Sequence, residues 1–330
     1  MALRMGLPNR ASAAFDQALA PWISGGWYGR AVPLWERRAE IADRVTDILE
    51  LGDLYAMGAW VYHEVGHYGR SLEIADTGIG LVSGRGPNVE LHLRAWRVAS
   101  LYRLGRWDEA LEEFATRRRM LEHREDDPPY FVMHSFGFAG VMHQRRGERV
   151  QSDSLAAAML RMVTGTSGRL YPSLLRFLVV RGDLAAAKGL RRPHNWAVHA
   201  GEALEAESEL LAAAAEWDRA TDLLSEMRRH AQVGDAPALA AFADRLEGRA
   251  ALAGGDLPEA QRSLERAASG FEAIDAPWER ALTDLDLARV ASSAGKSDEA
   301  GAWAARAATT FEQLQDTEGV AAARALTETG

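Results

Sequence analysis

Residues 245–300 read RLEGRAALAGGDLPEAQRSLERAASGFEAIDAPWERALTDLDLARVASSAGKSDEA, and they contain two copies of one pattern. In each copy a helical stretch runs into a glycine, Gly255 or Gly295, and acidic residues follow that suit the first turn of a second helix. Apolar and small residues recur three and four positions apart on both sides, as packed helix faces require. Because glycine accepts the positive φ that ends a helix, each copy predicts helix, tight turn, helix.

The same turn pattern recurs along the whole chain. Its members are GWYGRA from Gly26, GHYGRS from Gly66, GRWDEA from Gly105, GERVQS from Gly147, GDLAAA from Gly182, AEWDRA from Ala215, GDLPEA from Gly255 and GKSDEA from Gly295. Successive members start 33–42 residues apart. A near-constant period of this size predicts stacked helical hairpins rather than one compact domain.

The composition supports an all-α protein and excludes several kinds of site. Only six of the 330 residues are isoleucine, against many Ala, Leu, Arg and Glu, which favours helix over sheet. Cysteine is absent, so disulfides, thiolate zinc sites and cysteine nucleophiles are excluded, and a reducing cytoplasm is the expected location. No apolar run approaches the roughly 20 residues that cross a bilayer. The net charge of −9 argues against a nucleic-acid partner.

The turn residues and their neighbours carry a family resemblance. Ala288, Gly295 and Ala300 form one set, and further sets are Gly248, Gly255, Leu257 and Ala260, and Gly105, Trp107 and Ala110. Such sets resemble tetratricopeptide repeats, over residues 10 to 315. The resemblance implies a right-handed α-solenoid, with about eight hairpins of about 40 residues and a terminal helix near Thr317–Leu326. The solenoid is expected to span residues 1–330, with two lobes at 10–165 and 166–330.

The long period also resembles the C-terminal sensor or scaffold arrays of large actinobacterial regulators. These are ATPase-linked nucleotide cyclases or regulators of the LuxR/MalT type. The resemblance implies a scaffold or sensor module in bacterial signalling or transcriptional regulation. Phosphate-binding and nucleophile-elbow motifs are absent from this sequence. An alternative is therefore that the chain is part of a cyclase or ATPase regulator whose catalytic domains lie elsewhere.

The segment His63-Glu64-Val65-Gly66-His67 matches the H-E-x-x-H pattern of zinc peptidases. Two histidines four apart share one face of a continuous helix. Gly66, however, falls on the repeated turn, so the chain should bend between His63 and His67. A zinc hydrolase is therefore only a second alternative, and neither a cofactor nor a metal site is predicted.

If the hairpins stack as in tetratricopeptide repeats, their first helices line a concave groove. Polar and aromatic residues at the inward positions are Trp60, His63, His92, Tyr102, Arg103, His134, Gln144, Arg145, Arg176 and Arg249, together with Glu64, Arg169, Arg245 and Arg289. The arginines favour a protein or peptide ligand with acidic groups, because guanidinium groups pair with carboxylates. The competing interpretation is that these arginines pair with glutamates of adjacent helices. The predicted function is a non-catalytic peptide-binding scaffold; the sequence does not indicate an oligomeric state.

Overall fold

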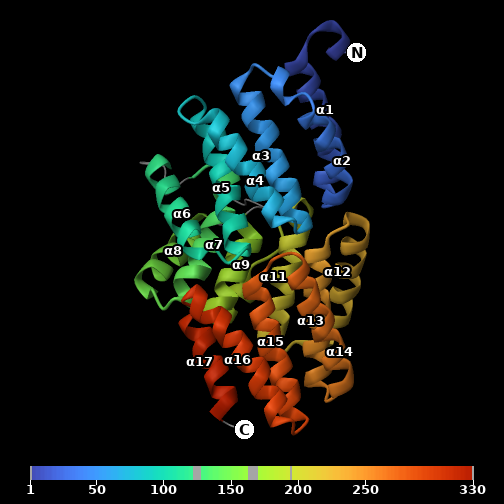
Figure 1. Ribbon diagram of the computed structural model, residues 1–330, viewed down its shortest axis with the longest axis vertical. Coiled ribbons are helices and arrows are strands. Elements are labelled where there is room, and N and C mark those ends of the chain that lie inside the picture. Colours follow the sequence, from blue (N-terminus) through green and yellow to red (C-terminus); the bar gives the residue numbers. More distant parts are fainter. Residues whose placement is uncertain (1, 122–127, 163–169, 194, 329–330) are drawn as a thin grey trace.

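The computed structural model describes residues 2–121, 128–162, 170–193 and 195–328, and within them it contains helices and no strands (Figure 1). The α-helices are α1 (Pro8–Ser24), α2 (Tyr28–Ala39), α3 (Ile48–Val65), α4 (Tyr68–Val82), α5 (Pro87–Arg103), α6 (Trp107–Leu121), α7 (His134–Arg145), α8 (Arg149–Met162), α9 (Leu170–Arg181), α10 (Leu184–Gly189), α11 (Ala200–Ala213), α12 (Ala220–Gly234), α13 (Pro237–Ala253), α14 (Leu257–Ala273), α15 (Pro277–Ser293), α16 (Ser297–Leu314) and α17 (Thr317–Glu328). They form consecutive hairpins, so the predicted all-α solenoid is confirmed.

The backbone reverses at each of the eight predicted turns. Positive φ angles occur at Gly26, Gly66, Gly105, Gly147, Gly182, Ala215, Gly255 and Gly295. Seven of these residues are glycine, which adopts this conformation without a Cβ clash. Ala215 takes it at φ 54°, where the sequence has alanine in place of glycine. The repeat register is therefore confirmed, and the terminal helix α17 begins at Thr317 as predicted.

The zinc-peptidase interpretation of His63–His67 is not compatible with this backbone. Helix α3 ends at Val65, and Gly66 follows in the left-handed conformation with φ 95°. His63 is buried in the last turn of α3, whereas His67 is exposed at the N-cap of α4. The two imidazoles therefore do not share a helical face.

Gly66 gives a test of the turn register. An added Cβ at this positive φ is strained and would lie 2.8 Å from the Cβ of Ala238. We expect Gly66→Ala to lower the free energy of unfolding by about 1–3 kcal/mol in urea denaturation. Gly69→Ala is the matched control, because Gly69 lies inside α4 with open space around it. It should raise stability by about 0.5–1 kcal/mol; equal effects of the two changes would contradict the turn.

The first helix of each hairpin lies on the inside of the array. α3 packs on α5, α5 on α7, α7 on α9, α9 on α11, and α11 on α13. We call the surface that these first helices share the inner face. The largest hydrophobic cluster runs from Leu19 to Ala323 and so joins both ends of the chain. The expected lobe boundary at 165/166 lies outside the described residues.

The array closes on itself after five hairpins. Added Cβ atoms at Gly26, Gly66 and Gly105 would lie 2.6–2.8 Å from atoms of Ala197 or Ala200, of Ala238 and of Pro277, and one at Gly147 would lie 3.4 Å from Thr317. Each contact joins a turn to the start of a first helix about 170 residues further along, in α11, α13, α15 or α17. Figure 1 shows the resulting arrangement, with α11 to α17 lying below α1 to α6.

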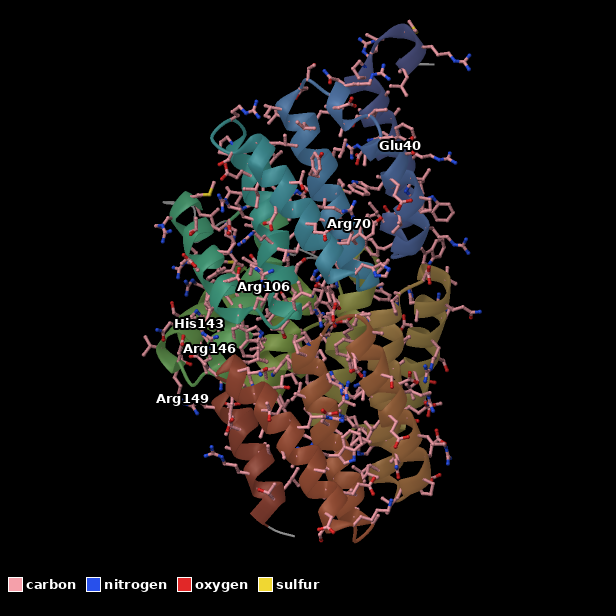
Figure 2. All side chains as sticks on the ribbon, in the orientation of Figure 1. Glu40, Arg70, Arg106, His143, Arg146 and Arg149 are labelled. Carbon is pink, nitrogen blue, oxygen red and sulfur yellow. The ribbon has the colours of Figure 1, made fainter. Side chains whose placement is uncertain are left out.

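Polar contacts strengthen this junction on the outside. Arg146, labelled in Figure 2 near the start of α17, pairs with Asp108 of α6 at 2.8 Å. Its Nε also donates to the carbonyl of Leu314, at the end of α16, at 3.2 Å. Arg146 therefore joins the two stacked layers. Among the described helices, none combines the length and apolar character that crossing a bilayer requires.

Candidate functional site

The predicted groove residues do come together on the inner face, but facing helices cover most of them. They lie there because the turns that follow α1, α3, α5 and α7 meet the starts of α11, α13, α15 and α17. His92, Arg145 and Arg249 are half-buried and Arg289 is exposed, whereas the other predicted residues in the described part of the chain are buried. Arg169 lies outside the described residues. The inner face is therefore largely a filled interior in this structure.

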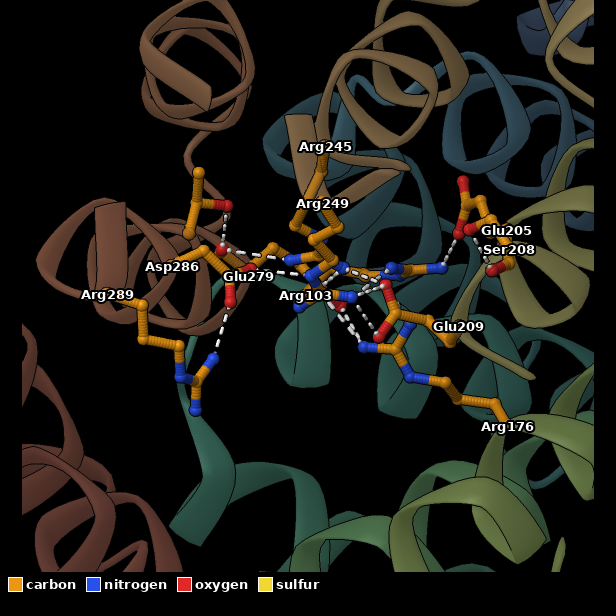
Figure 3. A network of polar contacts seen from close by, with 11 residues as sticks. Arg103, Arg176, Glu205, Ser208, Glu209, Arg245, Arg249, Glu279, Asp286 and Arg289 are labelled. Atoms are coloured by element: carbon orange, nitrogen blue, oxygen red, sulfur yellow. Dashed lines mark hydrogen bonds and ion pairs between the residues drawn. The ribbon is translucent and has the colours of Figure 1, made fainter. Parts of the chain in front are cut away.

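Four arginines and four carboxylates form the centre of that interior (Figure 3). We call this set, Arg103, Arg176, Arg245, Arg249, Glu205, Glu209, Glu279 and Asp286, the arginine network. Glu279 lies at its middle, with Arg176 Nη2 2.8 Å and Arg245 Nη2 2.7 Å from its carboxylate oxygens. Arg103 contacts it at 3.4 Å and also pairs with Glu205. The network contains equal numbers of arginines and carboxylates, and Arg289 also pairs with Asp286 at its edge.

Glu209 is the second shared acceptor. Arg245 Nη2 lies 2.7 Å and Arg249 Nη1 3.1 Å from its carboxylate, and Arg249 also pairs with Asp286. Burial opposes ionisation of Glu209, but Arg245, Arg249 and Arg176 outweigh it and hold its pKa well below its usual range. Arg249 therefore has carboxylate partners on α11 and α15, which are helices that neighbour its own.

At Glu205 the effect of burial is not outweighed by an arginine. Burial raises the pKa of Glu205 to about 7, against the opposing charge of Arg103. Arg103 is shared with Glu279, so it compensates Glu205 less fully than three arginines compensate Glu279. A cavity of about 10 Å³ beside Arg103 and Glu205 is large enough for roughly one water.

A second polar group closes the inner face near the C-terminus. Arg145 Nε donates to Asp316 at 2.9 Å, and Gln144 Nε2 donates to Glu318 at 2.9 Å. Trp278 Nε1 donates to the other oxygen of Asp316 at 2.8 Å. Gln144 and Arg145 are thus joined to residues that follow them by about 170 positions.

The predicted aromatic residues stack with one another. His134 stacks on Trp96 with ring centroids 4.2 Å apart, and Trp60 also stacks on Trp96, with centroids 5.8 Å apart. Tyr102 stacks on Phe138 at 4.8 Å, and half-buried His92 lies 5.0 Å from Phe131. The rings of Trp60, Tyr102 and His134 are buried and therefore fill part of the interior.

Next to these rings lies a buried cluster that joins α3 to α11. We call His63, Glu64, His199 and Glu202 the histidine–glutamate cluster. His63 Nε2 lies 3.2 Å from Glu202 Oε1, and His199 Nδ1 lies 3.1 Å from Glu64 Oε1. Burial opposes ionisation of Glu202, but the hydrogen bond and charge of His63, with Arg103 and His199, keep its pKa below its usual range. Ligand atoms of Glu64, His199 and Glu202 lie within 4.8 Å of one another.

The inner face opens at the far ends of α9, α11, α13 and α15. A groove of about 460 Å³ lies there, lined by Val179, Glu209, Ala212, Ala213, Trp217, Arg249, Leu252, Ala253, Asp286 and Arg289. We call it the end groove. Its walls are mainly apolar, and Arg289 stands at its edge with 48% of its side chain exposed. Of the predicted arginines in the described part of the chain, Arg249 and Arg289 line this open region.

Pairing of the arginines with glutamates of adjacent helices was the competing interpretation of the sequence, but sequence reasoning did not identify which acidic residues are the partners, nor His199. A signal for three of them was present: Glu202, Glu205 and Glu209 recur three and four positions apart, so they share one face of α11. Their surroundings are Ala- and Leu-rich, which marks that face as buried rather than solvated. His199 precedes α11, and no pattern in the sequence distinguished it.

No family model matches the chain, and no curated protein matches it either. Among solved structures, the chain is similar to a Rap protein complexed with competence and sporulation factor. The sequences are 14% identical, the TM-score is 0.48, and the match covers 97% of this chain and 82% of that one. This similarity is too low to bear on the function or the site.

Proposed function

We propose that the chain is a non-catalytic scaffold that binds a peptide segment of a partner protein in the end groove. The observation that carries the proposal is that the inner face, elsewhere filled by ion pairs and rings, is open at this groove. Its volume of about 460 Å³ lies within the range of about 300–1,000 Å³ that is usual for ligand sites.

The lining indicates what such a segment should contain. Leu252, Val179 and the ring of Trp217 offer apolar contacts. Arg289 makes one ion pair among the described residues, from Nη1 to Asp286, and its remaining donors are at the exposed edge. A guanidinium with free donors pairs well with a carboxylate. The expected ligand is an extended peptide that has an apolar side chain next to an acidic group.

Absence of cysteine makes the groove simple to test. A photo-crosslinker can be attached to a single cysteine introduced by Ala253→Cys, which lines the groove. The control is Ala302→Cys, which places the crosslinker on the exposed side of α16. With lysate from the source cell, we expect one partner to crosslink at residue 253 and not at 302. Arg289→Glu should weaken binding of that partner by at least about tenfold, roughly 1.4 kcal/mol, in titration of the purified pair.

The result that would contradict the proposal is equal crosslinking at both positions, or a partner whose affinity is unchanged by Arg289→Glu and by Trp217→Ala. Arg262→Glu is the matched control for charge, because Arg262 is 61% exposed on α14 and does not line the groove. Replacing Arg103, Arg145 and Arg176 is a poor test, since these side chains hold the interior together.

We also propose that this scaffold serves a bacterial signalling or transcriptional regulator in the cytoplasm. The support is the residue-level resemblance to repeat arrays of large regulators, with catalytic cyclase or ATPase domains elsewhere in the protein. The reading frame around this segment tests the proposal: an adjoining ATPase, cyclase or DNA-binding domain is expected. Unrelated neighbouring domains would leave the scaffold proposal standing and remove the regulator proposal.

A further inference from the structure

We infer that the histidine–glutamate cluster is a structural zinc site that joins the two stacked layers of the array. The cluster supplies two imidazoles and two carboxylates, which are nitrogen and oxygen ligands that zinc accepts. They come from two distant segments, His63 and Glu64 at the end of α3 and His199 and Glu202 at the start of α11. An ion held among them would tie these segments together.

The spacing of the ligand atoms suits one ion. Atoms of Glu64, His199 and Glu202 lie within 4.8 Å of one another, and His63 Nε2 is 3.2 Å from Glu202. Ligands about 2.0–2.2 Å from a tetrahedral zinc lie about 3.4 Å apart, so a small contraction of the cluster completes the coordination.

One carboxylate oxygen points to a missing partner. Glu202 is 94% buried, and its Oε2 makes no hydrogen bond among the described residues, although Oε1 contacts His63. A buried carboxylate oxygen without a donor is costly, and a cation satisfies it. The second oxygen of Glu64 lies close to the start of α11, where a Cβ at Gly201 would be 3.2 Å from it.

The charge balance of the interior favours a divalent ion. The arginine network already has as many carboxylates as arginines. Glu64 and Glu202 add two more carboxylates, which hydrogen-bond to His199, Trp60 and His63, and Arg103 of the network also acts on Glu202. One divalent cation with neutral imidazoles balances both carboxylates. All four side chains are at most 6% exposed, so the site has no position open to a substrate and is structural rather than catalytic.

Only part of the H-E-x-x-H motif at His63–His67 belongs to the proposed zinc site. His63 and Glu64 contribute to the proposed site, but the third and fourth ligands come from α11 and its N-cap. His67 lies beyond the turn at Gly66 and is exposed. His67 is therefore a sharp control: a peptidase-type site requires it, whereas the proposed site does not.

The test is zinc content and thermal stability of the full chain, refolded with zinc chloride or with chelator. We expect one zinc per chain, and a Tm about 5 °C higher when free zinc is about 100 times Kd. Glu202→Gln and Glu64→Gln should lose the zinc and the Tm shift, while His67→Ala should keep both. Circular dichroism verifies that each variant is folded.

Cobalt provides a second measurement that needs no variant. Cobalt bound to the wild-type chain should give the visible absorption of a four-coordinate ion, and zinc should displace it. A wild-type chain without zinc, without a Tm shift and without a cobalt spectrum would overturn the proposal. So would zinc that persists in folded Glu202→Gln, or zinc that His67→Ala releases.

Discussion

Glu279→Gln is expected to lower the free energy of unfolding by about 3–5 kcal/mol, because it leaves buried arginines without their shared carboxylate. Glu279 is 2% exposed and contacts Arg103, Arg176 and Arg245. Glutamine keeps the shape of the side chain but removes its charge. Its amide NH₂ group would also face the N–H donors of the arginines. The arginines remain charged in the variant, and their uncompensated burial destabilises the folded state.

The pH dependence of this loss follows from the sign of the pKa shift. Burial opposes ionisation of Glu279, but Arg176, Arg245 and Arg103 hold its pKa below its usual range. Its contribution is therefore present above the pKa of an unfolded glutamate, about 4.3, and disappears as the pH falls through the lowered pKa of the folded state. The difference between wild type and variant should be greatest near neutral pH and should narrow in acid.

Urea denaturation at several pH values measures both effects. Glu272→Gln is the control, since Glu272 is 71% exposed and pairs only with Arg280 among the described residues; its change should stay within about 1 kcal/mol. A loss below about 1 kcal/mol for Glu279→Gln would show that the arginine network does not hold the interior together.

The second large effect is expected for Trp278→Ala, which should cost about 3–5 kcal/mol. Trp278 is 3% exposed in the first turn of α15, where that helix meets the turn after α5. Its ring lies 5.6 Å from Trp107 and 5.2 Å from the guanidinium carbon of Arg176. Truncation opens a cavity between the stacked layers and removes the hydrogen bond to Asp316.

Thermal and urea unfolding of Trp278→Ala are best compared with those of Trp22→Ala. Trp22 is 36% exposed on α1, so its loss should cost about 1 kcal/mol or less. Similar destabilisation by the two changes would contradict a tightly packed junction between the layers.

The turns were predictable because their signal is local. A glycine at φ above zero, as at Gly66 or Gly255, has a sequence signature that needs no knowledge of distant contacts. The apolar faces of the helices have a similarly local period. The hairpins, their register and the bend within His63–His67 therefore followed from the repeat alone.

Closure of the inner face was not predictable in the same way. It depends on small rotations between successive hairpins that accumulate over five units, and the repeat pattern does not encode them directly. The partners of Arg103 and Arg145 accordingly lie 102 and 171 residues away, at Glu205 and Asp316. Both arginines lie on the inner face, and facing carboxylates pair with them there.

The central claim is that the turns of the first four hairpins stack directly on the starts of α11, α13, α15 and α17, and a disulfide tests it most directly. A Cβ at Gly147 lies 3.4 Å from Thr317 Oγ1, close to the roughly 3 Å that separates a Cβ from the far sulfur of a disulfide. Because the chain has no cysteine, Gly147→Cys with Thr317→Cys introduces a single pair. Mild oxidation of the folded monomer should form the bridge, detected as a shift in gel mobility, and a Gly255→Cys and Thr317→Cys control should not form it. An open array would hold residues 147 and 317 more than about 30 Å apart, so the absence of a bridge within one chain would contradict the account.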